Sequence, residues 1–208
     1  SKYKVLVQQL YCMETLARVD VICLDKTGTI TEGKMQVVDY EPFTSYSKKE
    51  MQEILNAFST HSLDNNATML AIKDHFKEKN TWEKEESIAF SSERKFSALS
   101  FKNKEAYYLG APEVLAKENT NILKKIEKYQ EDYRVLLLAK QKEIQKKPEN
   151  LEIIGMILIE DIVRKEAKAT LDYFKSQGVM VKIISGDNVS TVLNIAHKVG
   201  LTNVKGLD

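Results

Sequence analysis

A short apolar run that ends in an aspartate and a glycine-containing turn constrains the fold of this chain most. Residues 19–24 are apolar except for Asp20, and residues 25–31 follow at once with the sequence DKTGTIT. The run predicts a buried strand of a parallel sheet, because such strands are covered on both faces. Asp25 then lies at the carboxyl edge of that sheet, where open α/β folds bind their ligands.

The side chains of this segment suit phosphoryl transfer. The carboxylate of Asp25 can act as a nucleophile toward a phosphoryl group and form an aspartyl-phosphate. Lys26 and the backbone N–H groups around Gly28 can bind phosphate oxygens, and the small side chains of Thr27 and Thr29 leave room for them. The alternative is an acidic strand end followed by a solvated turn, which the complete segment after an apolar run disfavours.

Composition narrows the classes of protein that remain. The 208 residues include 31 basic and 30 acidic side chains, so charge gives no reason to expect a nucleic-acid partner. The two cysteines, Cys12 and Cys23, offer no disulfide framework, and we expect Cys23 to be a small core residue in a reducing, cytosolic setting. No apolar stretch approaches the roughly 20 residues of a membrane helix, and no signal peptide is visible.

Periodicity along the chain predicts an α/β fold with an insertion. A strand is expected at 34–41, a capping box at 47–50 opens a helix, and Asn66 is a candidate cap of a second helix. Further strands are expected at 87–101, 106–109, 134–139, 151–159 and 179–184, and helices at 164–177 and 190–199. We expect an incomplete Rossmann-like parallel-sheet domain, residues 1–33 and 151–208, with an inserted antiparallel α+β domain at 34–150.

Residues 25–31 resemble the phosphorylation motif of P-type ATPases, ion pumps of the E1–E2 class within the haloacid dehalogenase superfamily. The soluble phosphatases of that superfamily carry a second aspartate two residues after the nucleophile for proton transfer. Thr27 stands at that position, and its hydroxyl cannot transfer protons near neutral pH. The resemblance covers essentially the whole chain and implies a long-lived phosphoenzyme. It makes 1–33 and 151–208 two parts of a phosphorylation domain and 34–150 a nucleotide-binding domain.

Two segments of the insertion resemble the nucleotide pocket of this family. Residues 90–97 (FSSERKFS) imply that Phe90 stacks on adenine, worth about 1–3 kcal/mol, and that Lys95 is the basic contact. The residues alone also allow Phe90 in the core and Lys95 at a solvated strand end. Residues 109–113 (LGAPE) resemble a Lys-Gly-Ala-Pro-Glu element in which Gly110 permits close approach to the nucleotide. Because Leu109 replaces the lysine, we expect weaker ATP binding or more reliance on stacking and Lys95.

Arg134 matches a family arginine that contacts the β-phosphate, and the less favoured alternative is a surface arginine that caps a strand. Residues 161–164 (DIVR) stand where the family has Asp-Pro-Pro-Arg. This implies that Asp161 orients the nucleotide at the domain junction, with Arg164 close by.

Residues 185–188 (SGDN) resemble the Thr-Gly-Asp-Asn segment of the family. The resemblance implies that Ser185 and Gly186 bind the transferred phosphoryl group near a helix N-terminus, and that Asp187 supports the nucleotide or the loop. Residues of these types also cap helices, and both roles can hold at once.

The resemblance implies ATP and Mg²⁺ as cofactors, with the metal held by the Asp25 carboxylate and the Thr27 main-chain carbonyl. It implies transport of a cation, calcium first and magnesium second, by a multi-pass parent whose membrane and actuator domains are this region's partners. This chain would then lie on the cytoplasmic face of the membrane.

A lysine and a later Gly-Asp-Gly-x-Asn-Asp segment of the family are not among these residues. We therefore expect the 208 residues to bind nucleotide but to phosphorylate themselves poorly or not at all. A soluble phosphatase of the superfamily and a non-catalytic ATP-binding module remain as alternatives.

Overall fold

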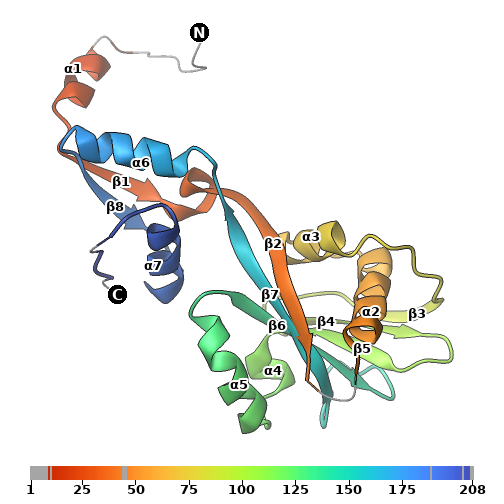
Figure 1. The fold of residues 1–208 in the computed structure, drawn as a ribbon. Helices are drawn as coiled ribbons and strands as arrows, with labels where there is room; N and C mark the ends of the chain where they lie inside the picture. The colour runs from red at the N-terminus through yellow and green to blue at the C-terminus, as the bar shows by residue number, and fades with distance from the viewer. Residues whose placement is uncertain (1–8, 10, 44–45, 188, 203, 207–208) are drawn as a thin grey trace. The chain divides into compact units, whose positions relative to one another are not determined.

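The computed structural model describes the whole chain except residues 1–8, 10, 44–45, 188, 203 and 207–208 (Figure 1). It divides into two compact units. The first, here called the split unit, comprises Ser1–Glu32 and Val163–Asp208, and the second, the inserted unit, comprises Gly33–Ile162.

The split unit contains a parallel pair of strands, β1 (Val21–Asp25) and β8 (Met180–Ile184), which lie side by side in Figure 1. Helices α6 (Ala167–Ser176) and α7 (Val189–Lys198) contribute to its core, and α1 (Tyr11–Ala17) precedes β1. Leu24, Val181 and Ile183 pack on that core, whose buried members are Ile30, Leu171, Ile195, Ala196, Val199 and Leu201. Helix α6 ends before Gly178, which adopts the left-handed φ of 74° that glycine tolerates best.

The sequence predicted that β1 is buried on both faces, and this prediction is wrong for one of them. Alternate residues of β1 and β8 are exposed, and these include Val21, Met180 and Ile184 at 38%, 58% and 62%. Cys23 lies on the same face and is exposed, so it is not the core residue that the sequence predicted. The physical reason is that the core of α6 and α7 packs against only one face of this two-stranded sheet in the described residues.

The inserted unit contains a six-stranded sheet in the order β2-β7-β6-β5-β4-β3. Neighbouring strands from β3 to β7 pair in antiparallel fashion. The strands are β2 (Thr31–Pro42), β3 (Lys84–Ile88), β4 (Phe96–Phe101), β5 (Ala106–Gly110), β6 (Arg134–Gln141) and β7 (Glu152–Val163). The expected strand at 87–101 is thus divided, with residues 89–95 forming a loop between β3 and β4.

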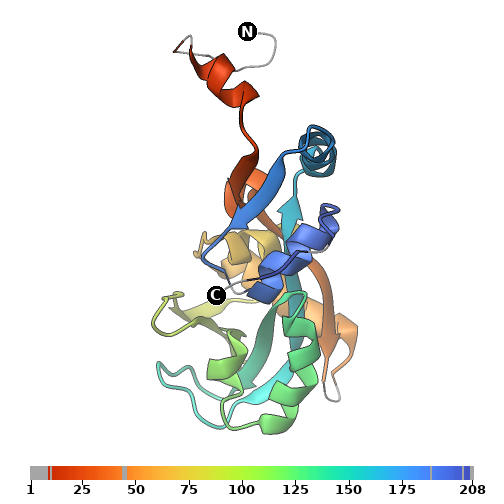
Figure 2. The ribbon, with the colours of Figure 1, turned by 90° about the vertical axis from the view of Figure 1, so that its left-hand side faces the viewer.

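Helices cover both faces of this sheet, as Figures 1 and 2 show. Helices α2 (Lys48–His61) and α3 (Ala67–His75) lie on one face, and α4 (Pro112–Leu115) and α5 (Thr120–Gln130) lie on the other. Strand residues alternate between the two resulting cores, so Tyr107 belongs to the first and Tyr108 to the second.

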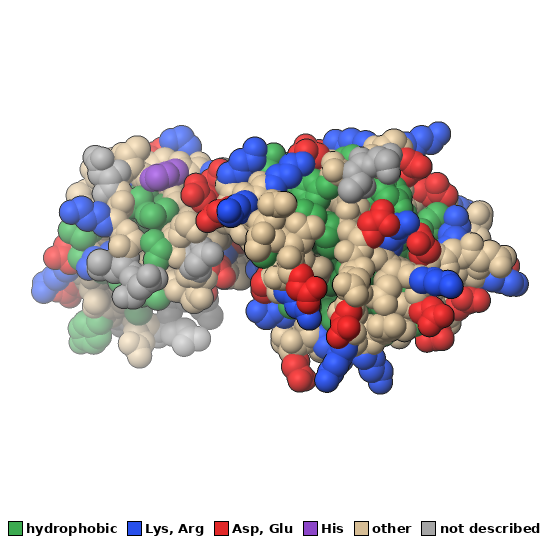
Figure 3. Space-filling model, turned by 90° about the horizontal axis from the view of Figure 1, so that it is seen from below, with side chains coloured by type: hydrophobic (Ala, Val, Ile, Leu, Met, Phe, Trp, Pro, Cys, Tyr) green, Lys and Arg blue, Asp and Glu red, His purple; other side chains and the backbone are tan. Residues whose placement is uncertain are grey.

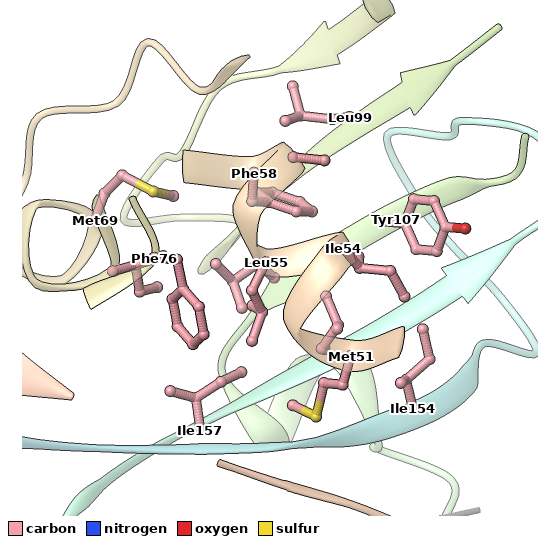
Figure 4. Close-up of a cluster of buried hydrophobic side chains, with 14 of the residues drawn as sticks. Met51, Ile54, Leu55, Phe58, Met69, Phe76, Leu99, Tyr107, Ile154 and Ile157 are labelled. Atoms are coloured by element: carbon pink, nitrogen blue, oxygen red, sulfur yellow. The ribbon is translucent and has the colours of Figure 1, made fainter. Parts of the chain in front are cut away.

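Helix α2 confirms the local signals of its sequence. Ser47 and Glu50 form the expected capping box, and each satisfies a backbone N–H of the other residue. The stripe of Met51, Ile54, Leu55 and Phe58 is buried and packs onto the sheet (Figure 4). Asn66 caps α3 by accepting a hydrogen bond from the N–H of Met69 at 2.9 Å, as predicted.

The strand expected at 151–159 belongs to the antiparallel sheet and not to the parallel one. Strand β7 pairs with β6, and its residues alternate between the two cores. The split between the two compact units falls between Ile162 and Val163.

On the face seen in Figure 3, lysine and arginine side chains are interspersed with aspartate and glutamate. Within the described residues, no helix is both long and apolar enough to cross a membrane.

Candidate functional site

Asp25 ends β1 directly beside the end of β8. Asp25 pairs in parallel register with Ile184, so Ser185 and Gly186 leave the sheet at the same edge. The carboxylate is exposed and accepts a hydrogen bond from the N–H of Thr27 at 3.3 Å. The split unit therefore brings Asp25, Thr27, Ser185 and Gly186 to one edge, with a carboxylate that a ligand can reach.

The turn after Asp25 has its own internal support. Gly28 adopts φ 79°, which glycine tolerates best, although an added Cβ would meet nothing within 4 Å. The buried hydroxyl of Thr31 accepts from the N–H of Gly28 and donates to the carbonyl of Lys26, both at 3.3 Å. Nη2 of Arg164 donates a hydrogen bond to the carbonyl of Gly28 at 2.8 Å. This bond helps to fix the backbone of the turn.

Lys26 connects this turn to the loop after β8. Its side chain is buried, with 3% of its residue area exposed, and its ammonium forms an ion pair with the carboxylate of Asp187. The N–H of Asp187 also donates to Oγ of Ser185 at 3.2 Å. Asp187 thus contacts both the turn and its own loop, and Lys26 is anchored at the same edge as Asp25.

The Asp25 carboxylate and the Thr27 carbonyl at this edge are suitable ligands for a Mg²⁺ ion that is also bound to a substrate phosphate. No cluster of three or more His, Cys, Asp or Glu side chains suited to a metal occurs in the described part of the chain. Mg²⁺ is commonly held by one or two carboxylates together with waters and substrate phosphates. The exposed Asp25 carboxylate and the Thr27 carbonyl are ligands of that kind.

In the inserted unit, the residues assigned to the nucleotide gather at one end of the sheet. Phe96, the first residue of β4, pairs with Gly110, which pairs in turn with Leu137 of β6. Arg134 opens β6 opposite Ile159 of β7. Because of this pairing, one end of the sheet carries the strand ends and loops that contain these residues: Phe90, Lys95, Gly110, Arg134 and Asp161.

Phe90 is the second residue of the loop between β3 and β4 and is 41% exposed, so it is not the core residue that the sequence also allowed. Its N–H donates to the two carboxylate oxygens of Asp64 at 3.1 and 3.3 Å. The loop is closed by Arg94, which donates to the carbonyl of Ala89 at 2.7 Å. An exposed ring on a held backbone is suited to stack on a planar base.

Asp64 is the residue near this loop that sequence reasoning missed. It follows α2, and its own N–H donates to Oγ of Ser62 at 3.2 Å. Lys73 of α3 donates to its carbonyl at 2.9 Å. The Ser-x-Asp spacing indicates a local turn, but nothing local indicates a partner 26 residues away at Phe90.

Lys95 has a left-handed backbone, with φ 56°, and its ammonium pairs with Oε1 of Glu113 at 3.0 Å. Partial burial raises the pKa of Glu113, but its hydrogen bonds to its own backbone N–H and to Lys95 outweigh that effect and hold the pKa below its usual range. Glu113 is therefore ionised at neutral pH. An anionic ligand that binds Lys95 competes with this carboxylate.

Gly110 lies against the start of β4. An added Cβ would lie 2.4 Å from Cβ of Phe96 and 2.6 Å from the carbonyl oxygen of Lys95. The close approach in this structure is thus between β5 and the start of β4. Leu109, at the position of the family lysine, is buried in the core between the sheet and helices α2 and α3.

Sequence comparisons relate the chain to haloacid dehalogenase-like hydrolases and to cation-transporting ATPases. The profile of the haloacid dehalogenase-like hydrolases matches residues 19–205. A probable cation-transporting ATPase, exp7, of Streptococcus pneumoniae is 41% identical over 96% of this chain and 26% of the relative. The calcium-transporting ATPase CtpE of Mycobacterium bovis is 36% identical over 94% of this chain and 25% of the relative. The chain thus spans about a quarter of the length of these relatives.

Solved structures give the same fold. A zinc-transporting PIB-type ATPase in the E2.Pi state superimposes with a TM-score of 0.67 at 22% identity, covering 91% of this chain and 29% of that one. The catalytic domain of the CPx-ATPase CopB-B gives a TM-score of 0.62 at 16% identity, covering 96% of this chain and 66% of that one. At these identities the likeness concerns the fold alone.

Proposed function

The chain belongs to the haloacid dehalogenase-like hydrolases, and we propose that it is the nucleotide-binding and phosphorylation region of a cation-transporting P-type ATPase. Its homologues are cation-transporting P-type ATPases. The observation that carries the proposal is the exposed Asp25 carboxylate at the end of β1, next to the end of β8. Thr27 occupies the position at which a phosphatase of the superfamily needs a second aspartate.

Asp25 is the proposed nucleophile toward ATP. One of its carboxylate oxygens forms a bond to the γ-phosphorus while the bond from that phosphorus to the bridging oxygen of ADP breaks, and ADP leaves. The backbone N–H groups of the turn at Gly28 and the Ser185 and Gly186 loop bind the phosphoryl oxygens. Lys26, anchored by Asp187, supplies positive charge at the same edge.

Water later attacks the phosphorus of the aspartyl-phosphate, which releases inorganic phosphate and restores the carboxylate. Thr27 provides no proton acceptor for that water, so the phosphoenzyme lasts long enough to drive a conformational change. Mg²⁺ held by Asp25 and the Thr27 carbonyl would offset the repulsion between carboxylate and phosphate.

The inserted unit is the proposed ATP-binding domain. Phe90 stacks on adenine, and Lys95 and Arg134 meet the phosphates. Asp161, near the end of β7, orients the nucleotide, and the Arg164 contact to Gly28 keeps the phosphorylation turn in place. Gly110 acts by keeping β4 and β5 close, which positions Lys95.

Calcium is the first candidate for the transported cation and magnesium the second. A relative named as a calcium-transporting ATPase at 36% identity supports calcium. Under this proposal the region lies on the cytoplasmic face of a membrane, and its partners are the membrane and actuator domains of the same parent protein.

Removing the ring of Phe90 tests the nucleotide site. We expect Phe90→Leu to weaken ATP binding by the 208-residue chain by roughly 5- to 150-fold, because stacking contributes about 1–3 kcal/mol. Phe90→Tyr keeps the ring and should bind within about threefold of the wild type. Isothermal titration calorimetry with ATP measures both. An unchanged dissociation constant for Phe90→Leu would show that adenine does not bind at this loop.

A further inference from the structure

A pair of hydrogen bonds joins the loop that carries Phe90 to a distant part of the inserted unit. Phe90 is the second residue of this loop, residues 89–95, and its N–H donates to both carboxylate oxygens of Asp64, 26 positions earlier in the chain. Asp64 lies in the connection between α2 and α3. A backbone N–H binds a carboxylate more strongly than a neutral acceptor, because the acceptor is charged. The aromatic end of the loop is therefore tied to Asp64.

Asp64 is itself held from two sides. Its N–H donates at 3.2 Å to Oγ of Ser62, a buried residue at the end of α2. Its carbonyl accepts a 2.9 Å hydrogen bond from the ammonium of Lys73 in α3. Both helices bury side chains in the core on this face of the sheet. The carboxylate is thus an acceptor in a fixed place.

The other hydrogen bonds of the loop do not fix it to the rest of the unit. The N–H of Arg94 donates to Oγ of Ser91 at 3.2 Å, and Nη2 of Arg94 donates to the carbonyl of Ala89 at 2.7 Å. These bonds shape the loop from within. In the described part of the chain, the hydrogen bonds that leave residues 90–94 for another element all end on Asp64.

We propose that Asp64 is a positioning residue for nucleotide binding, whose carboxylate holds the Phe90 backbone so that the ring is presented to adenine. The inference rests on the proposed stacking role of Phe90. Without the carboxylate the loop also adopts arrangements that misplace the ring, and the apparent affinity for ATP falls with the fraction of molecules that present it. The charge of Asp64 alone would repel phosphates, so its removal would strengthen ATP binding. A positioning role predicts the opposite sign.

Isothermal titration calorimetry of the 208-residue chain with ATP separates these two effects. We expect Asp64→Ala to weaken ATP binding by roughly three- to tenfold, as when a third to a tenth of the molecules present the ring. Asp64→Asn removes the same charge but keeps an acceptor oxygen for the Phe90 N–H, so it should bind ATP within about twofold of the wild type. Asp74→Ala removes an exposed carboxylate of α3 that pairs with Lys77, and this control should bind ATP as the wild type does.

Inorganic tripolyphosphate distinguishes positioning from a general loss of structure. It has no base, so its binding through Lys95 and Arg134 should be the same in Asp64→Ala and in the wild type. The ring is already absent from Phe90→Leu, so Asp64→Ala should cause no further loss of ATP affinity in that background. Wild-type or stronger ATP binding by Asp64→Ala, or equal weakening for tripolyphosphate, would overturn the role of Asp64. Unchanged ATP binding by Phe90→Leu would instead contradict the stacking proposal on which this role rests.

Hydrogen exchange in the unmodified chain provides a measurement that does not depend on how a variant folds. The Phe90 amide hydrogen should exchange at least about tenfold more slowly than in an unstructured peptide, because its bond to Asp64 must open first. Saturating ATP should slow this exchange further, since ATP binds the loop in its held arrangement. Exchange at the rate of an unstructured peptide, or a rate that ATP leaves unchanged, would contradict the proposal.

Discussion

The Asp25→Asn variant of the full-length protein is expected to lose ATP turnover by roughly a thousandfold or more. The amide has nearly the same shape as the carboxylate but is not a nucleophile toward phosphorus. Asp25 is exposed at the end of β1, so the substitution leaves the core of the split unit intact. Release of inorganic phosphate from ATP by membranes that contain the protein measures the effect.

Asp20→Asn is the matched control for that experiment. Asp20 precedes β1 at its other end, and its backbone carbonyl accepts from the N–H of Met180 at 2.7 Å, an interaction that the substitution keeps. This variant should turn over ATP at close to the wild-type rate. Turnover by Asp25→Asn at a rate similar to that of Asp20→Asn would exclude Asp25 as the nucleophile.

The second large effect is expected from Gly110→Ala in the inserted unit. The added Cβ meets Cα and Cβ of Phe96 and the carbonyl oxygen of Lys95 at 2.4 to 2.7 Å. These atoms cannot move away easily, because the Lys95 carbonyl accepts a 2.9 Å hydrogen bond from Ala111 and β4 is paired with β5. Overpacking of this kind costs about 1–3 kcal/mol, which corresponds to a fall in Tm of roughly 2–12 °C.

Scanning calorimetry of the 208-residue chain checks this expectation. Gly186→Ala is the glycine control for stability, since an added Cβ there meets nothing within 4 Å and no left-handed backbone is involved. Its transition should match that of the wild type. If Gly110→Ala unfolds at the wild-type temperature, β4 and β5 do not approach each other as closely as described.

Signals that act over a few residues predicted the structure well. The capping box of Ser47 and Glu50 and the cap at Asn66 are both present. Each of these depends on hydrogen bonds or backbone angles within one turn of helix, so the local sequence contains the whole cause.

Pairing between distant segments could not be predicted in the same way. The apolar run of β7 suggested a parallel sheet, but any strand covered by helices on both faces has such a run, and β7 lies in an antiparallel sheet between two cores. The apolar run of β1 predicted the strand, but it did not predict which face of the strand would be covered by helices. The contact of Arg164 with Gly28 joins residues 136 positions apart, and no local pattern encodes it.

The central claim is an aspartyl-phosphate at Asp25, and labelling of the full-length protein with ³²P from γ-labelled ATP tests it most directly. Acid-quenched membranes would be treated with hydroxylamine, which cleaves acyl phosphates, in the presence and absence of micromolar Ca²⁺. We predict a hydroxylamine-sensitive label on the peptide that contains Asp25, formed with calcium and absent from Asp25→Asn. If Asp25 is labelled equally with and without calcium, the phosphoenzyme is supported but calcium is excluded as the transported ion. No acyl-phosphate label with any cation tested would contradict the assignment as a P-type ATPase.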